Sequence, residues 1–136
     1  AEKVQEFTQS ASAEAATARQ GKTAFNIFSL TDALGKRDRK QLWVLYQKAT
    51  MNGSAPEEIH GILFWQLKAM LQAAQTGNPK DAGLNPYVYQ KSGGFLKNYS
   101  KKEVESLSFK LIELYHQARR GLVDMSCALE QFVLQL

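Results

Sequence analysis

The sequence predicts an all-α fold, a compact bundle of about five to seven helices. From Phe25 onward, apolar residues recur three and four positions apart, and short stop signals rich in Gly, Pro and Asn separate the periodic segments. Alternation of apolar and polar residues, which is typical of a strand, never persists beyond a few positions. With 136 residues, 44% of them hydrophobic, the chain is long enough for one buried core and short for a second module.

The first 22 residues differ in composition from the rest of the chain. Ala, Ser, Thr, Gln and Glu dominate them, and Val4 and Phe7 are their only large apolar residues. We therefore expect residues 1–22 to form a poorly anchored arm or linker, and residues 23–136 to form the helical domain.

The first strong helix is expected over residues 38–51. Asn52-Gly53 should end it, because these residues readily adopt the left-handed backbone conformation that terminates helices. At 100° per residue, one face of it collects the apolar positions Leu42, Leu45, Tyr46 and Ala49. The next helix should begin near Pro56, because Ser54 and Glu57 have capping-box spacing and proline is tolerated in an opening turn. Its apolar face is formed by Ile59, Leu63, Leu67, Met70 and Ala74, flanked by Ile62 and Leu71, and Gly77-Asn78-Pro79 ends it.

Three further start signals follow along the chain. Asn85-Pro86 predicts a short helix that breaks at Gly93-Gly94, since each glycine costs about 1 kcal/mol inside a helix. Ser100 and Glu103 form a second capping box, and Gly121 closes the helix that it opens. That helix has one apolar face, made of Val104, Leu107, Leu111, Leu114, Tyr115 and Ala118. Asp124 should cap the last helix, whose apolar face is Met125, Ala128, Leu129, Phe132 and Leu136.

Residue patterns for catalysis are weak. Residues 16–23 fit a permissive phosphate-binding loop around Gly21-Lys22, but no strand precedes them and no parallel sheet could hold a nucleotide. His60, His116 and Cys127 lack metal-ligand spacing, and we expect Cys127 to be a small buried side chain. We therefore predict no cofactor, no metal, no small-molecule substrate and no enzymatic activity.

Two further features of the sequence predict the cellular location of the protein. A single cysteine leaves no intramolecular disulfide, and the longest uncharged apolar stretch, residues 59–67, is far shorter than the roughly 18 residues of a membrane-spanning helix. We expect a cytoplasmic protein without a membrane partner.

Basic residues form two clusters in a chain of net charge +4. One runs from Lys36 to Lys40, and the other contains Lys97, Lys101 and Lys102. A solvated basic face is the simpler interpretation, because Asp38 interrupts the first cluster. Nucleic-acid binding is the alternative, with a phosphate backbone held by Lys36, Arg37, Arg39 and Lys40.

Several apolar residues lie off the predicted buried faces. Trp65 projects opposite to the Leu63 face, and Phe109 opposes the face of Leu107 and Leu111. Val44 is a weaker case of the same kind. Either neighbouring helices cover these side chains within the bundle, or they form a hydrophobic surface for a protein partner.

Taken in order, five segments resemble the C-terminal domain of the bacterial DNA polymerase III delta subunit. They are Phe25-Asn-Ile-Phe-Ser-Leu-Thr-Asp-Ala-Leu34, the charged start Asp38-Arg-Lys, Ile62-Leu-Phe-Trp-Gln-Leu-Lys-Ala-Met-Leu71, Asn85-Pro-Tyr-Val88 and Tyr99-Ser-Lys-Lys-Glu-Val104. The resemblance runs from Phe25 to Leu136. It departs from the family at Gly93-Gly94, where the family helix continues unbroken, and at Tyr115 and Arg119, where an acidic residue and a lysine are usual.

The resemblance implies an assembly role. In that family the protein belongs to the clamp loader, and its C-terminal helical domain joins the equivalent domains of the ATPase subunits and delta-prime in a collar. The collar holds the assembly together, touches DNA only indirectly and hydrolyses no nucleotide. By this resemblance the chain is a non-catalytic oligomerisation domain, with Trp65, Phe109 and Val44 as candidate interface residues.

Overall fold

A computed structural model describes residues 25–136, and the predicted arm at residues 1–22 lies outside that range. Every regular element of the described part is helical, which confirms the all-α prediction. The elements are α2 (Ser29–Gly35), α3 (Arg39–Met51), α4 (Pro56–Gln75), α5 (Pro79–Ala82), α6 (Pro86–Phe95), the 3-10 turn η1 (Leu96–Asn98), α7 (Lys101–Arg119) and α8 (Met125–Leu134).

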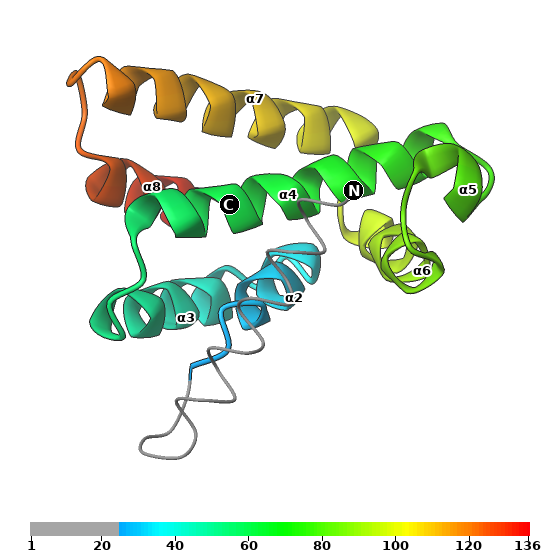
Figure 1. Cartoon of the computed structure of the whole chain (residues 1–136), viewed down its shortest axis with the longest axis horizontal. Coiled ribbons are helices and arrows are strands. Elements are labelled where there is room, and N and C mark those ends of the chain that lie inside the picture. The colour runs from blue at the N-terminus through cyan, green and yellow to red at the C-terminus, as the bar shows by residue number, and fades with distance from the viewer. Residues whose placement is uncertain (1–24) are drawn as a thin grey trace.

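The long helix α4 lies at the centre of the domain (Figure 1). It packs against α7 on one side and against α2 and α6 on others, while α8 closes one end by packing on α3, α4 and α7. Residues from most of these helices meet in one core, whose largest fully buried side chains include Leu30, Leu34, Leu42, Ile59, Leu63, Leu67, Met70, Leu111 and Leu129. The central position of α4 explains why it is apolar on more than one face.

The start of α3 is as predicted, and the start of α4 differs in one detail. Asp38 caps α3 by accepting a hydrogen bond from the Gln41 backbone N–H at 3.1 Å. Helix α4 begins at Pro56, but its N-cap is Ala55 and no side chain caps it, so the predicted capping box at Ser54 was wrong. Ser54 lies one residue too early to reach the first free N–H groups.

Most residues of the predicted α4 face are buried. Ala74 is the exception, because Ala73 faces the core in the last turn and Ala74 is exposed.

Helix α6 contradicts the predicted break at Gly93-Gly94 and runs on to Phe95. Asn85 caps its start by accepting from the Tyr87 backbone N–H at 2.8 Å. Its far end is held by tertiary packing, since Ser92 and Phe95 are buried on either side of the two glycines. Burial of these two residues outweighs the low helix propensity of glycine.

Helices α7 and α8 follow the predicted signals closely. Ser100 and Glu103 form the capping box, with both hydrogen bonds present. Asp124 caps α8 by accepting from the Ser126 backbone N–H at 2.8 Å. The expected burial of Cys127 was wrong, because this residue lies on the outward side of α8, two positions after the buried Met125.

The turn between α2 and α3 is tied to the start of α7 by four residues that we call the Arg37 latch: Arg37, Asn98, Tyr99 and Glu103. The Arg37 guanidinium donates to the Asn98 carbonyl at 3.1 Å and to the Glu103 carboxylate at 2.7 Å. It also lies 4.8 Å from the centre of the Tyr99 ring. These contacts hold Arg37 in a left-handed conformation, φ 56°, which residues other than glycine seldom adopt.

The latch predicts a pH-dependent stability. Hydrogen bonds from Arg37 and from the Ser100 backbone N–H lower the pKa of Glu103 from 4.5 to about 2. A carboxylate with a lowered pKa stabilises the fold above its unfolded pKa, and that contribution is lost as the pH falls from about 4.5 towards 2. Urea unfolding midpoints of the wild type and Glu103→Gln should therefore differ near pH 6 and converge by about pH 2.

Glu113→Gln is the matched control, because Glu113 is exposed on the same helix outside the capping box. A difference between wild type and Glu103→Gln that stays constant from pH 6 to pH 2 would show that the Glu103 charge does not support the latch.

Candidate protein-interaction surface

The exposed apolar residues of α7 gather on the side that continues into its seam with α4. Phe109 is 64% exposed and Ile112, one turn later, is 41% exposed. On a helix, residues three apart share a face, so the two side chains form one apolar surface. The structure thus places Phe109, a predicted interface candidate, in solvent.

The other two candidate interface residues are less accessible. Trp65 on α4 and Val44 on α3 are half-buried.

A hollow of about 240 Å³ lies between α4 and α7 beside Ile112. It is lined by His60, Phe64, Ile112, Tyr115 and His116. The His60 ring stacks on Phe64, with 6.3 Å between the ring centres, and lies 5.4 Å from the centre of the Tyr115 ring. Aromatic and aliphatic carbon thus forms much of the wall, which suits the burial of apolar side chains.

His60 fixes the floor of this hollow. The residue is buried, and its Nε2 donates a hydrogen bond of 2.8 Å to the Leu111 carbonyl of α7. Because a carbonyl can only accept, Nε2 carries the proton. His60, which lacks metal-ligand spacing in the sequence, therefore has a structural role.

A second hollow of about 350 Å³ adjoins the first, and Tyr115 lines both. Its other lining residues are Pro56, Glu57, Ala118, Arg119, Asp124 and Met125. The Arg119 guanidinium lies 6.0 Å from the centre of the Tyr115 ring. Together the two hollows form what we call the α4–α7 groove, which follows α4 from Pro56 to Phe64 and α7 from Ile112 to Arg119.

The predicted nucleic-acid residues Lys36, Arg37, Arg39 and Lys40 are all exposed. Arg37 is already engaged by the latch, and Arg39 donates weakly to the Leu134 carbonyl at 3.5 Å.

The latch also places the two basic clusters next to each other, which the sequence did not show. Its contacts to Asn98 and Glu103 bring the basic cluster at residues 36–40 beside the cluster of Lys97, Lys101 and Lys102.

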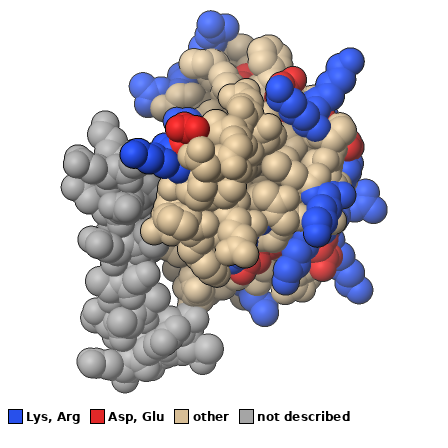
Figure 2. All heavy atoms as spheres, turned by 90° about the vertical axis from the view of Figure 1, so that its right-hand side faces the viewer, with Lys and Arg blue, Asp and Glu red and all other residues tan. Residues whose placement is uncertain are grey.

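The exposed Tyr87, which is 68% accessible on α6, was not among the residues predicted from the sequence. Asn85-Pro-Tyr has the form of a helix start, so the aromatic residue carried no separate signal. Lys91 lies over its ring, with 5.6 Å between Nζ and the ring centre. Figure 2 shows this end of the molecule, where uncharged residues occupy the centre of the face and Lys and Arg side chains lie around its edge.

The other candidates from the sequence, for nucleotide and metal binding, form no site within residues 25–136. The Gly21-Lys22 loop lies outside the described residues. Within residues 25–136, no three His, Cys, Asp or Glu side chains are grouped in a way that could hold a metal ion. None of the helices in that range is long and apolar enough to cross a bilayer.

A family model described as DNA polymerase III delta subunit, C-terminal domain, matches residues 24–136. No curated protein and no solved structure matches the chain significantly. The matched range includes every described residue, so the α4–α7 groove and the latch both lie inside it.

Proposed function

Because the chain belongs to the family formed by the C-terminal domain of the DNA polymerase III delta subunit, we propose that it is a non-catalytic assembly domain of the clamp loader. In this role it joins the C-terminal domains of the ATPase subunits and delta-prime in a collar. It contributes to sliding-clamp loading by holding these subunits together, and contacts DNA only indirectly.

The observation that carries this proposal is the exposed apolar surface of Phe109 and Ile112 beside the α4–α7 groove. A large aromatic side chain left in solvent next to an apolar hollow is typical of an interface residue. An assembly domain needs such a surface and no catalytic group.

Phe109→Ser should weaken assembly strongly while leaving the fold intact. Aromatic anchors at interfaces often cost about 2 kcal/mol or more when truncated, so we expect a loss of affinity of about 30-fold. The measurement is size-exclusion chromatography with light scattering on mixtures with the C-terminal domains of the ATPase and delta-prime proteins. Helical circular dichroism should not change, because Phe109 is mostly exposed.

Tyr87→Ser is the matched control, since Tyr87 is equally exposed but lies on α6. It should co-elute with the partner domains like the wild type. If wild-type chain elutes unchanged beside competent partners, the assembly proposal is wrong. If Tyr87→Ser is the defective variant, the interface lies at the α5–α6 end instead.

Trp65 and Val44 remain proposed interface residues of lower accessibility. Trp65→Ala should weaken assembly with little change in circular dichroism if the ring contacts a partner. Loss of the helical signal would instead assign Trp65 to the packing of the domain.

A nucleic-acid-binding module is the second candidate function, and the juxtaposition of the two basic clusters favours it. Lys36 and Lys97 are exposed on segments that the latch holds together. Binding of single-stranded or duplex DNA through them should weaken steeply with salt. Lys36→Ala with Lys97→Ala should weaken it further, whereas Lys80→Ala on α5 should not. No detectable binding at low salt would dismiss this candidate.

A further inference from the structure

We propose that the α4–α7 groove receives an amphipathic helix of a neighbouring clamp-loader domain, with acidic residues at the end that meets the start of α7. The inference rests on the proposed assembly function and specifies the chemistry of the partner. It combines three observations: the length of the groove, its lining and the charges at one end.

The length suits a short helical segment. Along α4 the groove extends from Pro56 to Phe64, which is about 12 Å at 1.5 Å per residue and corresponds to about two helical turns. Phe109 and Lys68 extend the same side of the seam by about one turn beyond Ile112 and Phe64. A partner helix of about three turns would cover this apolar surface, and one of about five turns would reach Lys101 and Lys102, which lie eight and seven residues before Phe109 on α7.

The lining suits apolar anchors spaced as on a helix. The two hollows, of about 240 and 350 Å³, lie on either side of Tyr115. Each is large enough for a leucine or phenylalanine side chain. Anchors at positions i and i+3 or i+4 of one helix would enter successive hollows, which is the usual pattern of helix-in-groove recognition.

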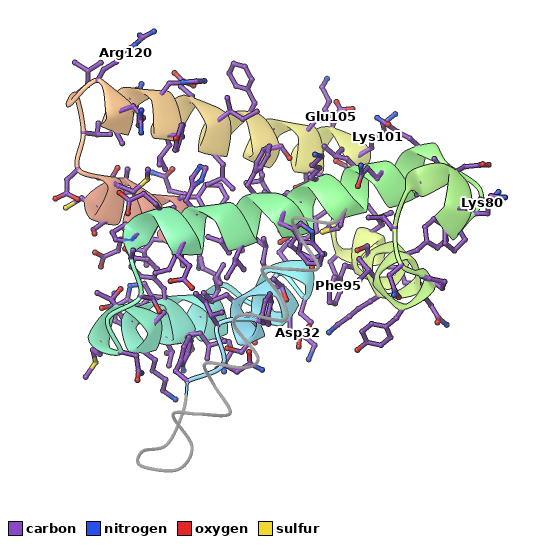
Figure 3. The ribbon with its side chains drawn as sticks, in the orientation of Figure 1. Asp32, Lys80, Phe95, Lys101, Glu105 and Arg120 are labelled. Atoms are coloured by element: carbon purple, nitrogen blue, oxygen red, sulfur yellow. The ribbon has the colours of Figure 1, made fainter. Side chains whose placement is uncertain are left out.

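The charged residues differ between the two ends of the surface around the α4–α7 groove. Lys101 and Lys102 begin α7, and Lys68 is exposed one turn after Phe64 on α4. Figure 3 shows Lys101 and Glu105 on the first turns of α7, with Arg120 at its opposite end. Glu105 is the exposed acidic residue at the basic end, whereas Glu57 and Asp124 offset Arg119 in the second hollow.

Lys101 and Lys102 are also unfavourably placed within their own helix. Cations in the first turn of a helix oppose its macrodipole. A carboxylate-rich partner would relieve that repulsion and pair with the ammonium groups at the same time. A second copy of this chain is a poorer occupant, because both copies carry a net charge of +4.

The test uses two synthetic amphipathic helices of about five turns with identical leucine anchors, one ending in three glutamates and the other in three lysines. Binding is followed by NMR of the isotopically labelled chain. The acidic peptide should bind about tenfold more tightly than the basic one, as expected for a few exposed ion pairs. Its largest shifts should fall on Phe64, Ile112 and Tyr115.

Two variants sharpen the test. Lys101→Glu with Lys102→Glu should reverse the preference between the peptides, and glutamate in a first helical turn is compatible with folding. Ile112→Ser should weaken both peptides equally, because it removes an apolar contact. The Tyr87→Ser control should change neither affinity.

Several results would overturn the inference: equal affinity for the two peptides, no binding of either, shifts centred on α6, or dimerisation of the chain through this face. The same experiments also distinguish the groove inference from the assembly proposal. If partner domains bind and the Lys101→Glu, Lys102→Glu variant binds them normally, the groove inference fails while assembly stands. If the acidic peptide binds in the groove but no partner domain co-elutes, assembly through the clamp-loader proteins fails.

Discussion

Gly35→Ala is expected to destabilise the domain by about 3 kcal/mol, the upper part of the range for overpacked cores. Gly35 ends α2 directly against the Phe95 ring of α6, and a Cβ added there would lie 2.1 Å from a ring carbon. The ring cannot move aside freely, because Phe95 is buried in the core. Chemical denaturation of the single variant measures the effect.

A double-mutant cycle tests the cause. In a Phe95→Leu background the ring is absent, so Gly35→Ala should cost much less than in the wild type. Gly61→Ala is the control, since a Cβ at Gly61 meets nothing within 4 Å and should be tolerated or slightly stabilising. Equal costs in the two backgrounds would show that Gly35 is required for some reason other than the Phe95 ring.

His60→Ala is expected to cost about 3 kcal/mol, as for other large-to-small changes of buried rings. The substitution removes the ring that contacts Phe64 and Tyr115 and also the hydrogen bond to the Leu111 carbonyl. It therefore loosens the floor of the α4–α7 groove as well as the seam between the two helices. Urea unfolding gives the free energy of unfolding for comparison with the wild type.

His60→Phe separates the two contributions. A phenyl ring retains the aromatic packing and loses only the hydrogen bond, so its cost should be about 1 kcal/mol. His116→Ala is the control, because His116 lines the same hollow but is exposed. Equal costs for His60→Phe and His60→Ala would show that the hydrogen bond, rather than ring packing, stabilises this seam.

Local signals predicted the long helices well. Asp38, Ser100 and Asp124 are side chains that bond to backbone N–H groups two or three residues later, so their positions alone indicate where α3, α7 and α8 begin. Helical periodicity likewise identified residues that the structure buries, such as Leu42 and Leu111.

Errors arose where distant contacts outweigh local preference. Gly93-Gly94 was expected to break α6, yet burial of Ser92 and Phe95 keeps the helix continuous. Asn78-Pro79 was interpreted only as the end of α4, although the same two residues also cap and open the single turn α5. The outcome at Gly93-Gly94 depended on packing that the sequence does not display, whereas the Asn78 cap is a local signal that was assigned only one of its two roles.

The candidate surface could be predicted only in part. Helical geometry correctly placed Phe109 away from the buried face of α7. It could not show that His60 and Leu111, 51 residues apart, bond across the floor of a groove. Nor could it show that Arg37 is engaged by Glu103, because that pairing depends on how α2, α3 and α7 dock.

The Arg37 latch has a consequence for how the chain folds. Its Arg37–Glu103 bond joins residues 66 positions apart, and closing so long a loop costs entropy. We therefore expect the bond to form late in folding, after helices such as α4 that rest on local contacts. Loss of the latch should therefore accelerate unfolding and leave the refolding rate nearly unchanged. The latch thus governs how long the native state persists rather than how quickly it is reached.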